Sequence, residues 1–188
     1  MNYLLLYAHP NPQSFNHAIL ETAVSTLKAK GQAVRIRDLY AQAFEPVLSG
    51  ADLGALHDGR TPTDIKAEQD ELAWAEHLVV IYPLWWVGMP AILKGYIDRN
   101  LSYGFAYSVD ANGIVPLLKG KKVTLFTTHG TPQAIYEQIG NYEAFYKTMD
   151  RGIFEFCGFE VKAHRYFGSV PSTDDRSEEH TSELQSHL

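Results

Sequence analysis

The stretch Tyr3-Leu-Leu-Leu-Tyr-Ala8, followed by His9-Pro-Asn-Pro-Gln-Ser14-Phe15-Asn16, decides the fold class of this chain. An unbroken apolar run of this length is typical of a short strand that is buried on both faces. Apolar residues then recur at every fourth position from Phe15 to Leu27, which predicts a helix that packs on the sheet and ends at Gly31. A strand that leads directly into such a helix is the beginning of a βαβ unit.

The same alternation continues along the chain. Further strands are expected at residues 33–38, 78–82, 122–127 and 159–167, and further helices at residues 61–75 and 91–100. A last helix, ended by Gly158, is expected to present one face made of Tyr142, Phe145, Tyr146, Met149, Ile153 and Phe156. Alternating strands and helices with short connections imply parallel strands joined by right-handed crossovers. We therefore expect an α/β fold with a doubly wound, five-stranded parallel sheet.

The sequence RSEEHTSELQSHL at residues 176–188 departs from this pattern, because it has no apolar periodicity. It begins where a last helix would be expected to cover the sheet. It resembles the peptide that a sequencing-adapter oligonucleotide encodes in one reading frame, so we interpret it as a non-native tail, with a natural polar tail as the alternative. The expected organisation is one α/β domain over residues 1–175 and this tail over residues 176–188.

Composition excludes several classes of function. The chain of 188 residues is 45% hydrophobic and 20% charged, which is the balance of a folded domain. Its net charge of -6 provides no positive field that would attract nucleic acid. The single cysteine, Cys157, rules out an internal disulfide, indicates a reducing compartment and is expected to be a small buried hydrophobe. Since neither a signal peptide nor a membrane-spanning run is recognised, we expect a cytoplasmic protein without membrane insertion.

The first candidate site is the loop from His9 to Asn16, between the first strand and the first helix. The first turn of a helix has unpaired N–H groups and the positive end of the helix dipole, which together favour an anion such as phosphate. Ser14 can add a hydroxyl donor, and His9 can add a ring N–H donor. The alternative is that Ser14 only caps the helix and His9 is a loop histidine with a structural role.

The second candidate site is the loop Pro83-Leu84-Trp85-Trp86-Val87-Gly88-Met89-Pro90, which follows the third strand. Adjacent tryptophans in a loop bounded by proline and glycine indicate a surface on which a planar ligand stacks. In the flavodoxin-like strand order 2-1-3-4-5 the first and third strands are neighbours, so these two loops flank one crevice. This placement favours a planar ligand that carries phosphate, although the tryptophans can also form a dimer contact.

The third candidate site is Thr127-Thr128-His129-Gly130, after the fourth strand, with Tyr136 shortly beyond it. It is expected to border the same crevice, where backbone amides can stabilise negative charge on the carbonyl edge of an isoalloxazine. Tyr136 either donates a hydrogen bond to a flavin or quinone oxygen or only fills space in the core. His9 and His129 lack carboxylate neighbours at ligand spacing, so no metal site is expected.

These motifs resemble the NAD(P)H:quinone oxidoreductase (DT-diaphorase-like) family from Tyr3 to about Pro171. The resemblance rests on SFN at residues 14–16, DIKAEQ at 64–69, YPLWWVGMPAILKGYIDRN at 82–100, GFAY at 104–107, TT at 127–128 and GIFEFCGF at 152–159, all in the order of the family. It implies a flavodoxin-like fold, FAD as the cofactor, NAD(P)H as the co-substrate, and a homodimer whose interface completes each active site.

The resemblance also implies roles for single residues. The FAD phosphates would be bound by His9, Ser14, Phe15 and Asn16. The flavin ring would lie along Leu84, Trp85, Trp86 and Val87, and its polar edge would meet Thr127, Thr128, His129 and Gly130. Tyr107 would line the nicotinamide and quinone pocket of the partner subunit, and Tyr136 would help to redistribute charge during hydride transfer.

The chain departs from the family at two points of the third site. The family usually has Thr-Thr-Gly-Gly where this chain has Thr128-His129-Gly130, so a side chain enters where glycine normally allows close approach. The tyrosine of the family also has a histidine partner, whereas Ile139 is the nearest candidate position here. These departures put charge relay by a tyrosine–histidine pair in doubt.

The expected function is two-electron hydride transfer from NAD(P)H through a flavin to a quinone, by a ping-pong mechanism. One alternative is an FMN-dependent enzyme that reduces azo or nitro compounds. Another is a regulatory flavoprotein subunit of a membrane transporter, whose flavin site would look the same. A one-electron flavodoxin carrier is disfavoured, because the longer segment from His9 to Asn16 replaces a short phosphate loop rich in threonine and serine.

Overall fold

The structure is a computed structural model that describes residues 1–170. The domain boundary expected at residue 175 and the tail at residues 176–188 lie outside the described residues.

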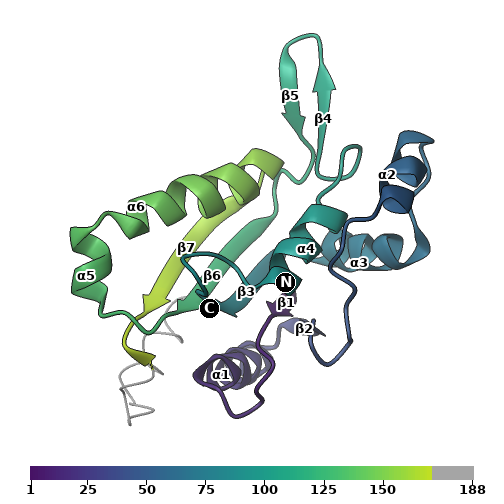
Figure 1. Ribbon diagram of the computed structural model, residues 1–188. Coiled ribbons are helices and arrows are strands. Elements are labelled where there is room, and N and C mark those ends of the chain that lie inside the picture. Colours follow the sequence, from purple (N-terminus) through teal and green to yellow (C-terminus); the bar gives the residue numbers. More distant parts are fainter. Residues whose placement is uncertain (171–188) are drawn as a thin grey trace.

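A single parallel sheet forms the centre of the molecule (Figure 1). Its strand order is β2-β1-β3-β6-β7, and β4 and β5 pair separately as an antiparallel hairpin. Counted within the parallel sheet alone, this is the predicted order 2-1-3-4-5, so the predicted doubly wound architecture is confirmed. The five strands are β1 (Asn2–Tyr7), β2 (Ala33–Asp38), β3 (His77–Pro83), β6 (Lys122–Thr128) and β7 (Glu160–Phe167).

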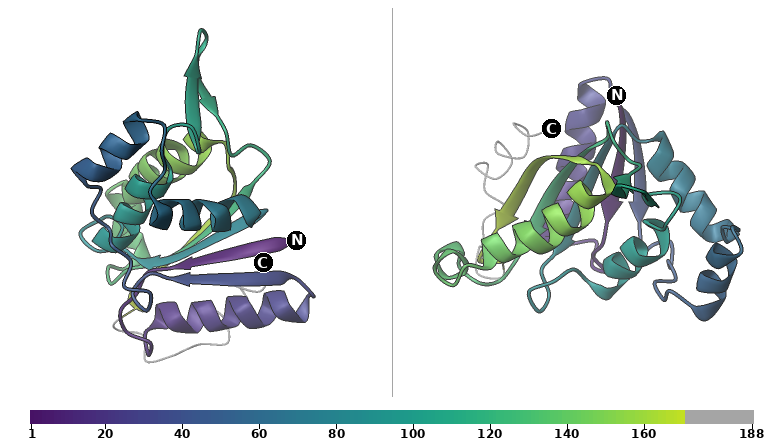
Figure 2. Two further views of the ribbon diagram at one scale, coloured as in Figure 1. Left: turned by 90° about the vertical axis from the view of Figure 1, so that its right-hand side faces the viewer. Right: turned by 90° about the horizontal axis from the view of Figure 1, so that it is seen from above.

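Helices cover both faces of the sheet, as the edge-on view in Figure 2 shows. Alternate residues of β1 point to opposite faces. Tyr3, Leu5 and Tyr7 pack with α1 (Phe15–Ala29), whereas Leu4 and Leu6 belong to the apolar layer on the other face. That second layer is covered by α3 (Thr63–Trp74), α4 (Ala91–Asn100), α6 (Asn141–Phe145) and the π-helix η1 (Tyr146–Glu155).

Two helices and one hairpin were not anticipated from the sequence. They are α2 (Gly50–His57), the hairpin of β4 (Tyr107–Asp110) with β5 (Gly113–Pro116), and α5 (Gln133–Gln138). The hairpin projects away from the body of the molecule beyond α4 (Figure 1).

The helix before Gly158 also differs from the expectation. The segment from Tyr146 is a π-helix, whose i→i+5 hydrogen bonds place more residues in each turn than an α-helix does. The expected aromatic face therefore drifts around the axis: Tyr146 and Phe156 are exposed, and Met149, Asp150 and Phe154 are buried. Asp150 is in this way turned toward the sheet.

Cys157 is buried, and burial raises the pKa of its thiol to about 11, as expected for a residue that acts as a small hydrophobe. Along residues 1–170, every helix is too short or too polar to cross a bilayer.

Candidate active site

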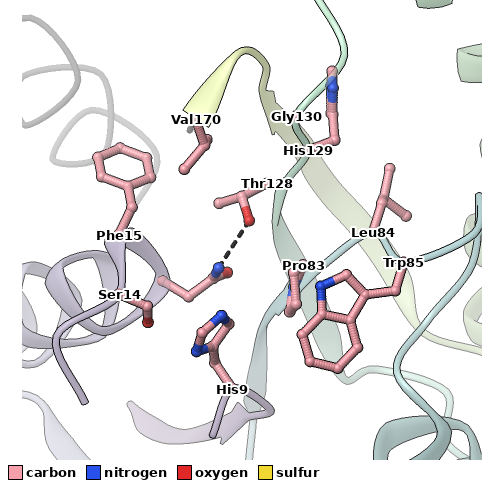
Figure 3. Close-up of a pocket in the computed structure, with 11 residues that line it drawn as sticks. His9, Ser14, Phe15, Pro83, Leu84, Trp85, Thr128, His129, Gly130 and Val170 are labelled. Carbon is pink, nitrogen blue, oxygen red and sulfur yellow. Dashed lines mark hydrogen bonds between the residues drawn. The ribbon is translucent and has the colours of Figure 1, made fainter. Parts of the chain in front are cut away.

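The three loops predicted from the sequence meet in one crevice of about 290 Å³ at the carboxyl ends of β1, β3 and β6 (Figure 3). Parallel strands bring their carboxyl ends to one edge of the sheet, and a ligand site forms where neighbouring strands lead to opposite faces. The crevice is lined by His9, Ser14, Phe15, Asn16, Pro83, Leu84, Trp85, Thr128, His129, Gly130 and Val170. Ten of these eleven residues belong to the predicted set, and Val170 does not.

The β1–α1 loop places the start of α1 at the crevice. Ser14 is the N-cap residue, and its hydroxyl accepts a 3.2 Å hydrogen bond from the amide of His17. The structure thus shows the capping role that was considered as an alternative, and Ser14 also lines the crevice. Asn16 is buried, and its Nδ2 donates a 2.8 Å hydrogen bond to Oγ1 of Thr128. Its Oδ1 atom is shielded from solvent and has no hydrogen-bond partner among the described residues.

His9 also lines the crevice and is drawn between Ser14 and Trp85 in Figure 3. Its Nδ1 lies 3.1 Å from the amide nitrogen of Asn11 and 3.3 Å from the carbonyl oxygen of the same residue. The shorter contact assigns Nδ1 as an acceptor, which leaves the proton of the neutral ring on Nε2. Burial lowers the pKa of His9, so the neutral form is favoured. His9 can therefore offer one N–H donor.

The β3–α4 loop is a tight turn that separates its two tryptophans. Trp85 and Gly88 exchange backbone hydrogen bonds of 3.0 and 3.1 Å, and the two residues between them have positive φ angles, 52° at Trp86 and 60° at Val87. Trp85 lines the crevice, with its ring centroid 5.9 Å from that of His9. Trp86 is fully exposed and Val87 half-exposed, and neither lines the crevice. The expectation that both indoles face the same slot is therefore wrong for the single chain.

Thr127 and Thr128, at the end of β6, lie on opposite faces of the sheet. Thr128 lines the crevice and contacts Asn16, whereas Thr127 is fully buried on the opposite face, where its Oγ1 lies 2.7 Å from Nε2 of His164. Successive side chains of a strand point to opposite faces, so the two threonines cannot both line one crevice. The side chain of Thr127 therefore does not line the crevice, and its predicted contact with the polar edge of the flavin could only be made by its backbone.

The ring of His129 does not occupy the space that a glycine would leave open. It is buried and directed away from His9 and Trp85 in Figure 3. Its Nδ1 lies 2.7 Å from the carbonyl oxygen of Thr131, and its Nε2 lies 3.1 Å from the hydroxyl of Tyr142. Burial lowers the pKa of His129 and raises that of Tyr142 to about 12. The residue therefore supports the loop from behind, and its backbone faces the crevice.

Tyr136 and Tyr107, the two predicted catalytic tyrosines, lie outside the crevice wall. The ring of Tyr136 is buried and stacks on His129, with centroids 4.5 Å apart. A tyrosine–histidine pair is thus present, with a different histidine from the one sought near Ile139. Tyr107 begins β4 and packs against Phe156 at 5.2 Å between centroids, on the wall of a separate hollow of about 190 Å³.

Sequence reasoning missed Val170 and Gly168, two residues before it. Val170 lies just after the carboxyl end of β7, which borders the same edge of the sheet as β6. A Cβ on Gly168 would lie 3.0 Å from the ring of His129 and 2.9 Å from the side chain of Gln133, so a glycine lets this segment pass close to the third loop. The only sequence signal that could have placed them at the site is their position directly after a predicted strand.

Residues 1–170 contain no cluster of three or more histidine, cysteine or acidic side chains placed to bind a metal ion.

The fold and the crevice define the class of protein: a doubly wound α/β protein with its ligand site at the switch point of the sheet. Comparison with protein families agrees, because residues 1–188 match the flavodoxin-like fold family. The chain belongs to this family.

Known relatives narrow the class to NAD(P)H oxidoreductases. A Haemophilus influenzae protein named as an NAD(P)H oxidoreductase is 38% identical over 185 residues, covering 98% of this chain and 92% of the relative. The ribosyldihydronicotinamide dehydrogenase (quinone) of Pongo abelii is 34% identical over 180 residues, covering 85% of this chain and 78% of the relative. The NAD(P)H:quinone oxidoreductase from Methanothermobacter marburgensis is 26% identical, with a TM-score of 0.86 over 99% of this chain and 96% of that structure. The resemblance drawn from the sequence is confirmed.

Proposed function

We propose that this protein is a flavin-dependent NAD(P)H:quinone oxidoreductase that works by a ping-pong mechanism as a cytoplasmic homodimer, with FAD as its cofactor. The observation that carries the proposal is the crevice itself, in which an aromatic wall, a helix N-terminus and a polar strand end converge. The names of the relatives support the choice of NAD(P)H and quinone as substrates. When bound, the flavin supplies the capacity to accept a hydride from one substrate and deliver it to another.

The described residues fit a flavin. Oδ1 of Asn16 is buried without a partner, and a buried polar atom of this kind is costly unless a ligand or water satisfies it. Phe15 and Asn16 form the first turn of α1 and line the crevice, so the N-terminal end of the helix, where a phosphate is favoured, borders it. We assign the phosphate contacts to His9, Ser14, Phe15 and Asn16.

The ring system would lie between the second and third loops. Pro83, Leu84 and Trp85 offer an apolar wall against which a planar ring packs. The backbone from Thr128 to Gly130 offers the polar edge. The His129 amide donates to the carbonyl of Phe167 at 2.8 Å, so we assign the N–H group that offsets negative charge during reduction to Gly130. The neutral ring of His129 behind this loop adds no charge of its own.

A second subunit would complete the site. Trp86 and Val87 are exposed beside the crevice, and Tyr107 stands on the projecting hairpin, outside the crevice of its own chain. Large aromatic side chains left in water at the mouth of a site are typical of surfaces that a partner covers. In the proposed dimer, Tyr107 of one subunit and Tyr136 of the other border the nicotinamide and quinone position.

The absorbance spectrum of the purified protein tests the proposal. We expect flavin bands that bleach on anaerobic addition of NADPH and return on addition of a quinone. The mass of the extracted cofactor distinguishes FAD from FMN, and elution volume with light scattering gives the oligomeric state. A protein that takes up neither flavin, or that binds flavin without oxidising NADH or NADPH, would contradict the proposal. The second outcome would favour a regulatory flavoprotein.

A further inference from the structure

A buried polar cluster lies behind the crevice, on the face of β6 opposite to Asn16. Nδ1 of His164 is 2.7 Å from Oδ1 of Asp150, and Nε2 of the same ring is 2.7 Å from Oγ1 of Thr127. The side chains of His164 and Asp150 are only 4% and 6% exposed. The three residues come from three elements, η1, β7 and β6, which Figure 1 shows side by side.

This cluster stands in an otherwise apolar layer. Met149 and Phe154, on the same helix as Asp150, belong to the core under η1. Tyr166 stacks on the His164 ring at 4.1 Å between centroids, and its hydroxyl lies 2.9 Å from Nδ1 of that ring, so it makes a further polar contact with the cluster. Burying a carboxylate and an imidazole among such residues costs free energy, and packed hydrophobic residues in their place are often as stable or more stable. Asp150 also lies within a π-helical segment, a distortion found frequently at functional sites. A purely structural purpose therefore explains the cluster poorly.

The cluster holds the strand end that forms the polar edge of the crevice. Thr127 is bonded from behind by His164, Thr128 is bonded from the front by Asn16, and His129 is bonded by Thr131 and Tyr142. The side chains of three consecutive residues are thus held by hydrogen bonds, those of Thr127 and Thr128 on opposite faces of the sheet. These contacts restrain the backbone that joins the three residues. An ionised carboxylate can only accept hydrogen bonds, so Asp150 requires a proton on Nδ1 of His164 and thereby fixes the ring that faces Thr127.

We propose that Asp150 and His164 are positioning residues for the active site: the carboxylate orients the imidazole, the imidazole holds the Thr127 hydroxyl, and the backbone from Thr127 to His129 is thereby fixed where it meets the polar edge of the flavin. This inference rests on the proposed function. It assigns a role to two residues that touch neither the crevice nor its ligand.

The chain contains a matched control for this hydrogen bond. Thr124, at the other end of β6, lies with its Oγ1 2.8 Å from Nε2 of His77, and both side chains are buried. Thr124→Val therefore removes a buried threonine–histidine bond of the same kind far from the crevice. Thr127→Val removes the proposed one with little change in shape, Thr127→Ser keeps the hydroxyl, and Asp150→Asn replaces the obligatory acceptor with a group that can also donate.

Two measurements test the inference on the full-length protein. Titration with FAD and with FMN should show Thr127→Val and Asp150→Asn binding about ten-fold more weakly, the loss expected when one hydrogen bond that fixes a binding group is removed. Thr127→Ser and Thr124→Val should bind as the wild type does. In the cofactor-free protein, the His129 amide, which donates to the carbonyl of Phe167 at 2.8 Å, should exchange faster in Thr127→Val but not in Thr124→Val.

The outcomes separate the two proposals. If the wild type binds flavin and Thr127→Val binds it equally well, the inference fails and the proposed function stands. If Thr127→Val and Thr124→Val lose affinity together, the bonds are structural only and the inference again fails. If the wild type takes up neither FAD nor FMN, both proposals are overturned.

Discussion

Nδ2 of Asn16 donates a 2.8 Å hydrogen bond to Oγ1 of Thr128, joining the first turn of α1 to the end of β6 across a sequence separation of 112 residues. Both residues are buried, and the second polar atom of the amide, Oδ1, has no partner among residues 1–170. Nδ2 of Asn16 therefore stabilises the fold, whereas Oδ1 is available to accept a hydrogen bond from a ligand.

This division predicts how Asn16→Leu behaves. The change leaves the buried hydroxyl of Thr128 unpaired, which should lower the free energy of unfolding by about 1–3 kcal/mol, and it removes the free amide oxygen, so flavin affinity should fall as well. The double variant with Thr128→Val removes both polar partners and should recover most of the stability without recovering flavin binding. Urea denaturation and flavin titration measure the two effects. Flavin affinity that returns together with stability would show that Asn16 acts only through the fold.

Substitutions of the two tryptophans should also have separable effects. Trp85 lines the crevice, so Trp85→Ala should weaken flavin retention and reduce the quenching of bound flavin fluorescence, even in a monomer. Trp86 is fully exposed in the single chain, so Trp86→Ala should instead weaken dimerisation and lower turnover at low protein concentration. Each variant is the control for the other. The assignment would be reversed if Trp86→Ala alone released the flavin at high protein concentration.

Strand and helix periodicity was sufficient to predict the parallel sheet, because β1, β3 and β6 are buried apolar runs whose character does not depend on distant contacts. Two missed elements had local signals. Ala111 and Asn112 connect β4 to β5, and Asn112 is followed by Gly113, the first residue of β5; an Asn-Gly pair between two short strands is a local hairpin signal. Ser49 and Asp52 form a capping box at the start of α2, with reciprocal hydrogen bonds of 3.0 and 3.1 Å.

Other parts of the site had no local signal. The separation of Trp85 from Trp86 depends on a turn in which a β-branched residue, Val87, has a positive φ angle, and sequence preferences argue against that conformation. The contact of Asp150 with His164 depends on the π-helical register of η1, which an α-helical period does not predict. The position of Thr127, in contrast, was predictable, because neighbouring residues of a strand face opposite ways.

The strain at Val87 leads to a further prediction. A non-glycine residue held at positive φ costs about 1–3 kcal/mol, so Val87→Gly should raise the melting temperature of the protein. If the strained turn presents Trp86 and Val87 to the partner subunit and the flavin, the same change should lower turnover by loosening the turn. Ala43, at φ 48° in the turn after β2, does not line the crevice and provides the control. Ala43→Gly should stabilise without loss of activity, and equal activity in both variants would show that the strain at Val87 has no functional purpose.

The pH dependence of stability should be dominated, on the acidic side of neutrality, by His77. Its ring stacks on Tyr3 at 4.9 Å between centroids, and its pKa is lowered from 6.5 to about 4, first by burial and then by the charges of Lys122 and Lys162. The unfolded chain therefore binds a proton at higher pH than the folded chain does. The contribution of His77 to the free energy of unfolding should be constant above about pH 7, fall as the pH is lowered from about 6.5 to about 4, and change by about 3 kcal/mol over that window.

The change His77→Gln isolates this contribution. Glutamine can still donate to Thr124, so the variant should remain folded, and it has no group that titrates between about pH 4 and 7. Urea denaturation at about pH 7.5 and about pH 4.5 should give a much smaller difference in the free energy of unfolding for the variant than for the wild type. The pKa values of His9 and His129 are also lowered, so these residues too reduce the free energy of unfolding as the pH falls. A smaller pH dependence of the free energy of unfolding will therefore remain in the variant. An unchanged slope in His77→Gln would mean that the histidine is already protonated in the folded protein, in which case the stacked, neutral ring described above would be wrong.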